Sequence, residues 1–122
     1  MGSNNPPAPG SAADQALLQL QQFYFYLNDN FASMIARCTT DAQRDQFKSE
    51  FVIARDAYWK AQNDILIEND TVLSSLTGQL SGLQNQIDQA VKGAAAIANI
   101  LGFVAAATGI AAKIATTATA GI

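Results

Sequence analysis

The stretch GAAAIANILGFVAAATGIAA, residues 93–112, lies between Lys92 and Lys113 and contains no charged side chain. Its roughly 20 residues are the length that an α-helix needs to cross the hydrocarbon core of a bilayer. A helix of this composition is apolar on nearly every side, so protein or lipid has to cover it. What covers this segment is therefore the central question for both fold and function.

The first ten residues, MGSNNPPAPG, contain three prolines and favour an extended leader rather than a helix. Met1-Gly2-Ser3 is typical of the remnant of an expression tag. The leader has neither the charged region nor the hydrophobic region of a signal peptide. Ser11, followed three residues later by Asp14, predicts the start of a first helix.

Between the leader and the charge-free stretch, apolar residues recur in three series with steps of three and four, the spacing of amphipathic helices. Asn28, Asp29 and Asn30 are poor helix formers that could kink or end the first helix, but the first series passes them in phase, which favours one continuous helix. The third runs in phase into the charge-free stretch, which predicts a helix with no stop before Gly102. The series are Leu17, Leu20, Tyr24, Leu27, Phe31, Met34 and Cys38; Phe47, Phe51, Ala54, Tyr58, Ala61 and Ile65; and Leu76, Leu80, Leu83, Ile87, Ala90, Ala94, Ile97, Leu101 and Val104.

These patterns predict an all-α fold, an up-down helical bundle of three long amphipathic helices with heptad-like, coiled-coil-like packing over residues 11–92. Residues 93–122 are expected to form an apolar, Ala/Gly-rich C-terminal helical segment. The first two helices have about 27 residues each, or roughly 40 Å, so a third helix continuing to Ala118 projects past them from about Asn99. Three coverings are open: fold-back at Gly102 or Gly109 as a fourth helix, packing against other copies, or entry into a membrane.

The candidate contact residues are the bulky and small residues of this segment. Ala105 and Gly109 have the small-xxx-small spacing of closely packed membrane helices. Asn99 and the glycines make insertion of a lone helix marginal. The residues expected to contact a membrane or another subunit are Ile97, Ile100, Leu101, Gly102, Phe103, Val104, Ala105, Ala106, Gly109, Ile110 and Ile114.

Composition narrows the function. The chain has a net charge of −3 and no concentrated basic patch, which argues against nucleic acid as a partner. It has no histidine and Cys38 is its sole cysteine, which excludes an internal disulfide, a Cys/His zinc site and a Cys/His nucleophile pair. No Gly-rich phosphate loop occurs. We therefore expect no catalysis, no cofactor, no metal and no small-molecule substrate.

The leading hypothesis is a small non-enzymatic helical protein whose apolar segment inserts into or onto a membrane as a homo-oligomer. This organisation is similar to that of helical pore-forming toxins, which shelter an apolar segment in the soluble form and expose it on assembly. The likeness is one of architecture, and no sequence motif carries it. The alternative is a soluble self-assembling structural or adaptor bundle that buries the segment between subunits; a monomeric four-helix binding module is the third. Without a visible signal peptide the compartment stays open, with a membrane-associated or secreted location favoured.

Overall fold

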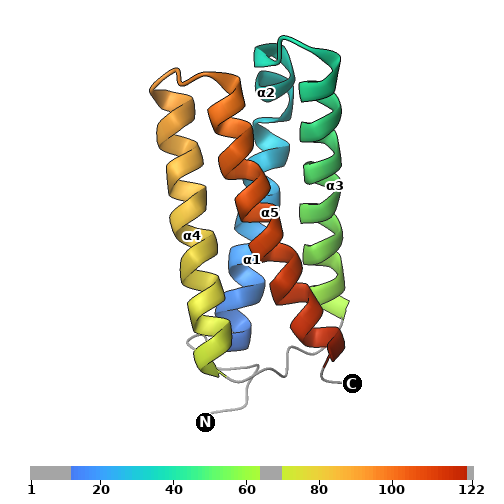
Figure 1. Ribbon diagram of the computed structural model, residues 1–122. Helices are drawn as coiled ribbons and strands as arrows, with labels where there is room; N and C mark the ends of the chain where they lie inside the picture. Colours follow the sequence, from blue (N-terminus) through green and yellow to red (C-terminus); the bar gives the residue numbers. More distant parts are fainter. Residues whose placement is uncertain (1–11, 64–69, 121–122) are drawn as a thin grey trace.

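The computed structural model describes residues 12–63 and 70–120, and these residues form five helices and no strand (Figure 1). The all-α class is confirmed. The Pro-rich leader, the Ser11 cap and Ile65 of the second apolar series lie outside the described residues. The helices are α1 (Ala12–Asp29), α2 (Phe31–Arg37), α3 (Asp41–Asn63), α4 (Asp70–Lys92) and α5 (Ile97–Ala120).

The long helices form a four-helix bundle in which α1 and α5 each pack against both α3 and α4. The described parts of α3 and α4 make at most marginal contact with each other, so these two helices occupy one diagonal of the bundle. Figure 1 shows α1 and α4 running in one direction and α3 and α5 in the other. The up-down arrangement is confirmed, and α5 completes the bundle as its fourth wall.

The charge-free stretch therefore folds back, but at a different place from the one expected. The prediction of a third helix without a stop before Gly102 is wrong: α4 ends at Lys92 and α5 begins at Ile97. Gly102 and Gly109, the expected turning points, lie inside α5. No part of the described segment projects beyond the bundle as a continuation of α4, because α5 returns antiparallel to it (Figure 1).

The turn after α4 has the hydrogen bonds of a Schellman motif. The Ala95 N–H donates to the Ala90 carbonyl at 2.9 Å, and the Ala94 N–H donates to the Val91 carbonyl at 3.3 Å. Ala94 adopts a φ of 57°, the left-handed conformation in which glycine is usually found. Ala94 is also exposed, so its assignment to the third apolar series is wrong. The chain thus turns on an alanine, one residue after Gly93.

The first helix is interrupted at Asn30, so the prediction of one continuous helix through residues 28–30 is wrong. Asn30 has φ −102° and ψ 9°, and its side-chain amide donates to the Tyr26 carbonyl at 2.8 Å. Its backbone N–H donates to the same carbonyl at 3.1 Å, and its own carbonyl accepts from the Met34 N–H at 2.8 Å. These bonds keep α1 and α2 in phase, which explains why the apolar series crosses the interruption.

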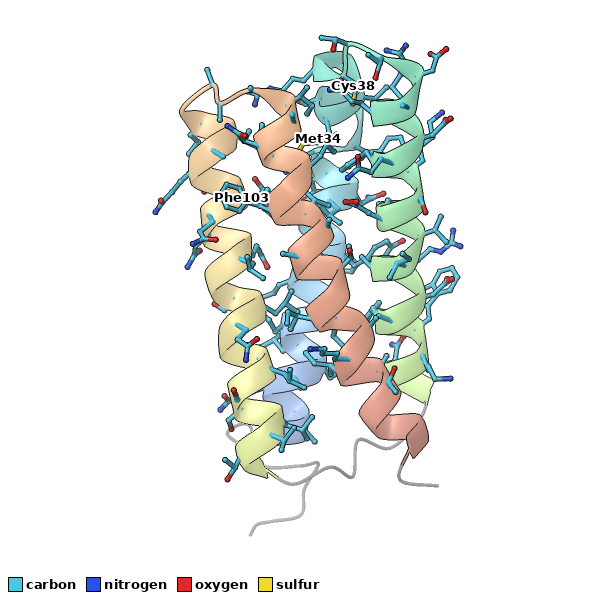
Figure 2. All side chains as sticks on the ribbon, viewed as in Figure 1. Met34, Cys38 and Phe103 are labelled. Atoms are coloured by element: carbon cyan, nitrogen blue, oxygen red, sulfur yellow. The ribbon has the colours of Figure 1, made fainter. Side chains whose placement is uncertain are left out.

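The core contains most of the three predicted series and adds residues that they omit. Phe23 and Leu73 are fully buried although neither belongs to a predicted series. Tyr24, beside Phe23, has its ring centroid 5.6 Å from that of Phe51 on α3. Met34 and Cys38 lie together at the end of the bundle where α2 ends (Figure 2). The largest fully buried side chains are Phe23, Phe47, Leu20, Leu27, Met34, Leu73, Leu80, Ile87, Ile100, Leu101, Ile114 and Val104.

Replacing Ala94 tests the turn. Ala94→Gly is expected to raise the free energy of unfolding by about 1 kcal/mol, because glycine adopts the left-handed conformation without the steric cost that a Cβ brings. Urea denaturation monitored by circular dichroism measures the change. The matched control, Gly93→Ala, is expected to give no gain, since its Cβ would lie 3.1 Å from the Gln89 carbonyl oxygen. A loss of stability in Ala94→Gly, as in an ordinary helix interior, would contradict this turn.

Candidate functional site

The inward side of α5 is built from bulky apolar residues together with the buried alanines Ala107, Ala111 and Ala115. Ile100, Val104 and Ile114 are fully buried, and Leu101 is nearly so. Phe103 projects from α5 towards α4 (Figure 2). Ile110, seven residues further on, shares this flank by helical periodicity, and both side chains pack against the core. The flank of α5 that meets α4 is therefore the bulky one.

The outward side of α5 carries small residues instead. Ala98, Gly102, Ala105, Ala106 and Gly109 are all exposed. A Cβ added at Gly102 or Gly109 would meet nothing within 4 Å, so neither glycine is needed for close contact within this bundle. We call this set the small-residue face. It covers about three helical turns without a charged group, from Ala98 to Gly109.

A groove lies between α3 and α5, where the small residues of α5 leave the space that bulkier side chains would fill. Its larger hollow has a volume of about 450 Å³ and its smaller one about 240 Å³, and they adjoin at Ile53 and Ala112. We call the two hollows together the α3–α5 groove. Its lining residues are Gln46, Ser49, Glu50, Ile53, Asp56, Ala57 and Lys60 from α3, and Ala105, Thr108, Gly109, Ala112, Ala115 and Thr116 from α5.

Glu50 is the buried carboxyl group of this groove, with only 8% of its surface exposed. Its Oε2 accepts a hydrogen bond from the Gln46 side-chain amide at 3.0 Å, whereas its buried Oε1 has no partner. Burial raises the pKa of Glu50, and the bond from Gln46 opposes that shift. The Oε1 atom of this carboxyl group therefore accepts no hydrogen bond from the described residues.

Two hydroxyl groups of α5, those of Thr108 and Thr116, form hydrogen bonds within the helix itself. Thr108 is buried, and its Oγ1 donates to the Ala105 carbonyl at 3.0 Å. The Thr116 Oγ1 donates to the Ala112 carbonyl at 2.8 Å. Because these bonds stay inside one helix, they persist in any surroundings that preserve the helix.

A polar cluster fastens the end of α4 next to the turn. The Lys92 ammonium lies 2.9 Å from Asp88 Oδ2, and the Tyr26 hydroxyl donates to Asp88 Oδ1 at 3.3 Å. Arg37 donates to the Val91 carbonyl at 2.8 Å. Burial first and the Asp88 charge second raise the pKa of Tyr26 to about 12. The cluster thus ties α1 and α2 to the last turn of α4.

The described residues contain no group of three or more His, Cys, Asp or Glu side chains placed to hold a metal ion. Cys38 is buried, and its thiol donates to the Met34 carbonyl at 3.3 Å. Within the described part of the chain, one helix is long and apolar enough to span a membrane, Ile97–Thr116, with a mean hydropathy of 1.7 and 44% of it buried. A core helix of a soluble bundle passes the same test.

The sequence-predicted contact residues fall into three groups in the structure: buried, half-buried and exposed. Ile100, Leu101, Val104 and Ile114 lie in the core of their own chain. Ile97, Phe103 and Ile110 are half-buried, and Gly102, Ala105, Ala106 and Gly109 are exposed on the small-residue face.

Sequence reasoning missed Glu50, Thr108 and Ala112 of the α3–α5 groove. The signal for Glu50 was available, because it lies three residues after Phe47 and four before Ala54, both in the second apolar series. A charged residue at such a position points toward the core. Nothing comparable marked Thr108 or Ala112, since threonine and alanine occur on every side of α5.

Replacing the Glu50 carboxyl group by an amide tests its burial. Glu50→Gln is expected to raise the free energy of unfolding at pH 7 by on the order of 1 kcal/mol, because it removes a buried charge while its carbonyl oxygen still accepts from Gln46. Chemical denaturation at a series of pH values measures the effect. The exposed control Asp45→Asn should leave the stability unchanged.

The pH dependence has a definite sign. Since the pKa of Glu50 is raised in the folded state above its usual 4.5, its contribution is most favourable below that value and is lost as the pH rises through the folded-state pKa. The stability difference between Glu50→Gln and the wild type should therefore be largest at neutral pH and shrink towards acid pH. A difference that grows on acidification would contradict the burial of an ionisable group here.

The sequence matches no protein-family model. Neither a curated protein nor a solved structure is significantly similar to it, so function has to be argued from the geometry of the chain itself.

Proposed function

We propose that this chain is a non-enzymatic, membrane-active helical protein whose α5 leaves the bundle and enters a lipid bilayer, with several copies assembling as it does so. The soluble bundle is then the sheltered form of an apolar helix. Residues 97–116 would supply the span, at roughly 30 Å for about 20 residues.

The observation that carries this proposal is the chemistry of the exposed side of α5. The outward side of α4 is also nearly uncharged, but Ser75, Gln79 and Gln86 expose hydrogen-bonding groups there. On α5, Asn99 and Lys113 are exposed as well, but the exposed residues between them present only methyl groups, hydrogens and backbone. A helix with this outer side gains little from water, whereas lipid or a second helix can cover it without stranding a polar side chain.

The polar side chains of residues 97–116 either bond to their own helix or lie near the ends of the proposed span. The Thr108 and Thr116 hydroxyls are bonded to their own helix and bring no unmet donor into lipid. Asn99 lies near the start of the helix, where a bilayer interface would be. Lys113 is exposed near the other end, where its stem can reach towards an interface.

Release of α5 has a consequence for the remaining helices. Because α5 packs against both α3 and α4, its departure exposes apolar side chains on both of them. Assembly with other copies is one way to cover these surfaces again, which links insertion to oligomerisation. It also means that deletion of α5 would disrupt the bundle, so tests of insertion need the full chain.

The small-residue face also favours the alternative function, a self-assembling bundle. Ala98, Gly102, Ala105, Gly109 and Ala112 follow one another in alternating steps of four and three, the spacing of a helix–helix contact line. A helix from another copy could approach this face closely because no large side chain stands on it. The two functions differ in what covers the face: lipid in one and protein in the other.

A single charge at the centre of the span tests insertion. Ala106→Glu is expected to leave a folded bundle, because Ala106 is exposed, and to reduce leakage of a small dye from liposomes at least tenfold. An acidic residue at the middle of a membrane helix costs about 3 kcal/mol. The matched surface control Gln86→Glu on α4 should leak dye as the wild type does, whereas Val104→Glu should unfold the bundle. Undiminished leakage by folded Ala106→Glu would exclude insertion of this helix.

A fluorescent label distinguishes lipid from protein as the covering. In a Cys38→Ser background, a polarity-sensitive dye at Ala106→Cys should shift to shorter emission wavelength with liposomes, while the same dye at Gln86→Cys should not. A shift at position 106 that depends on protein concentration without lipid would support the self-assembling bundle instead. No shift at position 106 in the presence of liposomes would contradict membrane insertion.

A further inference from the structure

The larger hollow of the α3–α5 groove combines an apolar surface with one deeply placed acidic group. Ile53, Ala105, Gly109 and Ala112 supply the apolar lining. Its volume of about 450 Å³ lies in the range of small-molecule sites, which are mostly apolar with a few converging polar groups. The hollow is therefore large enough for the apolar part of a small ligand.

The described residues around Glu50 supply no hydrogen-bond donor to its Oε1 atom. Its Oε1 is buried without a hydrogen bond, although Oε2 is bonded to Gln46. The Thr108 hydroxyl donates to a backbone carbonyl of its own helix and so does not serve Glu50. Lys60, the cation that lines the groove, belongs to the smaller hollow together with Asp56. An unpaired buried carboxylate favours a charged hydrogen-bond donor more than a neutral one.

We propose that the α3–α5 groove binds a primary alkylammonium ligand, whose ammonium group donates to the Glu50 carboxylate once a rotation of its side chain turns an oxygen towards the larger hollow, and whose alkyl chain lies against Ala105, Gly109 and Ala112. The ammonium group provides both the positive charge and the hydrogen-bond donors that this carboxylate lacks. The alkyl chain displaces water from the alanine and glycine positions, where no large side chain occupies the hollow. The inference is independent of membrane insertion, because it concerns the soluble bundle.

Binding of n-hexylammonium chloride to the full-length protein in lipid-free buffer at neutral pH tests the site. Isothermal titration calorimetry, with chemical-shift mapping by NMR, is expected to show saturable binding with the largest shifts at residues of the larger hollow. n-Hexanol, which has the same chain and no charge, is expected to bind at least tenfold more weakly. Equal binding of the alcohol and the amine would overturn the role of the carboxylate.

Two matched pairs of variants locate the ligand. Glu50→Gln should weaken n-hexylammonium binding at least tenfold, while Asp45→Asn, on the exposed side of α3, should not change it. Gly109→Leu should abolish binding by filling the hollow, while Gly102→Leu should not, since Gly102 is equally open but does not line the groove. Circular dichroism confirms that each variant is folded.

The results separate this site from the membrane function. Unaltered binding in Glu50→Gln, unaltered binding in Gly109→Leu, or the absence of saturable binding to the wild type would each overturn the proposed site. Because the titration contains no lipid, a failure there leaves the liposome measurements untouched. A failure of leakage likewise leaves the titration untouched.

Discussion

Closure of the bundle depends on the packing of α5 against two helices at once. α3 and α4 occupy opposite corners, so α5 on one side and α1 on the other hold them in place. Ile100, Val104 and Ile114 are fully buried in this contact. Burial of one such side chain contributes about 1.5–3 kcal/mol, and a small domain is stable by only about 5–15 kcal/mol. The charge-free stretch is therefore a structural requirement of the four-helix bundle.

The two flanks of α5, one towards α4 and one towards α3, differ in the size of their side chains. Phe103 and Ile110 fill the side towards α4, whereas the side towards α3 is lined by small residues such as Ala105 and Gly109. The α3–α5 groove follows directly from that inequality. Glu50 of α3 lines the larger hollow opposite these small residues. Small side chains on one helix thus create both the exposed apolar face and the hollow beside it.

The sequence predicted the apolar series well because burial follows the helical period. Leu20, Leu27 and Met34 in the first series, and Phe47 and Ala54 in the second, are buried as expected. The turn at the end of α4 was not predictable from that period alone, since α4 and α5 are both apolar in the same steps on either side of it. Lys92 followed by Gly93 was the available stop signal, being a basic residue in the last turn and then a glycine.

The break at Asn30 and the exposed side of α5 escaped prediction for different reasons. At Asn30 the helical hydrogen bonds continue, so the series stays in phase and the interruption leaves no trace in the spacing of apolar residues. In α5 almost every residue is apolar, and the period cannot show which side faces the core. Residue size carries part of that information, because no bulky apolar side chain in the described part of α5 is exposed, although the small residues lie on both sides: Ala107 and Ala111 are buried.

In the proposed insertion, the change in free energy arises mainly from the helices that α5 leaves behind. The bulky side chains of α5 are covered in the bundle and in lipid alike, so their transfer changes little. The apolar side chains that α3 and α4 direct at α5 lose their cover, which opposes release unless another copy replaces it. Glu50 acts in the opposite sense, since departure of α5 returns its carboxylate to water and relieves the cost of its burial. A cation bound at Glu50 would remove that relief and stabilise the closed bundle, so occupancy of the α3–α5 groove and release of α5 are expected to compete.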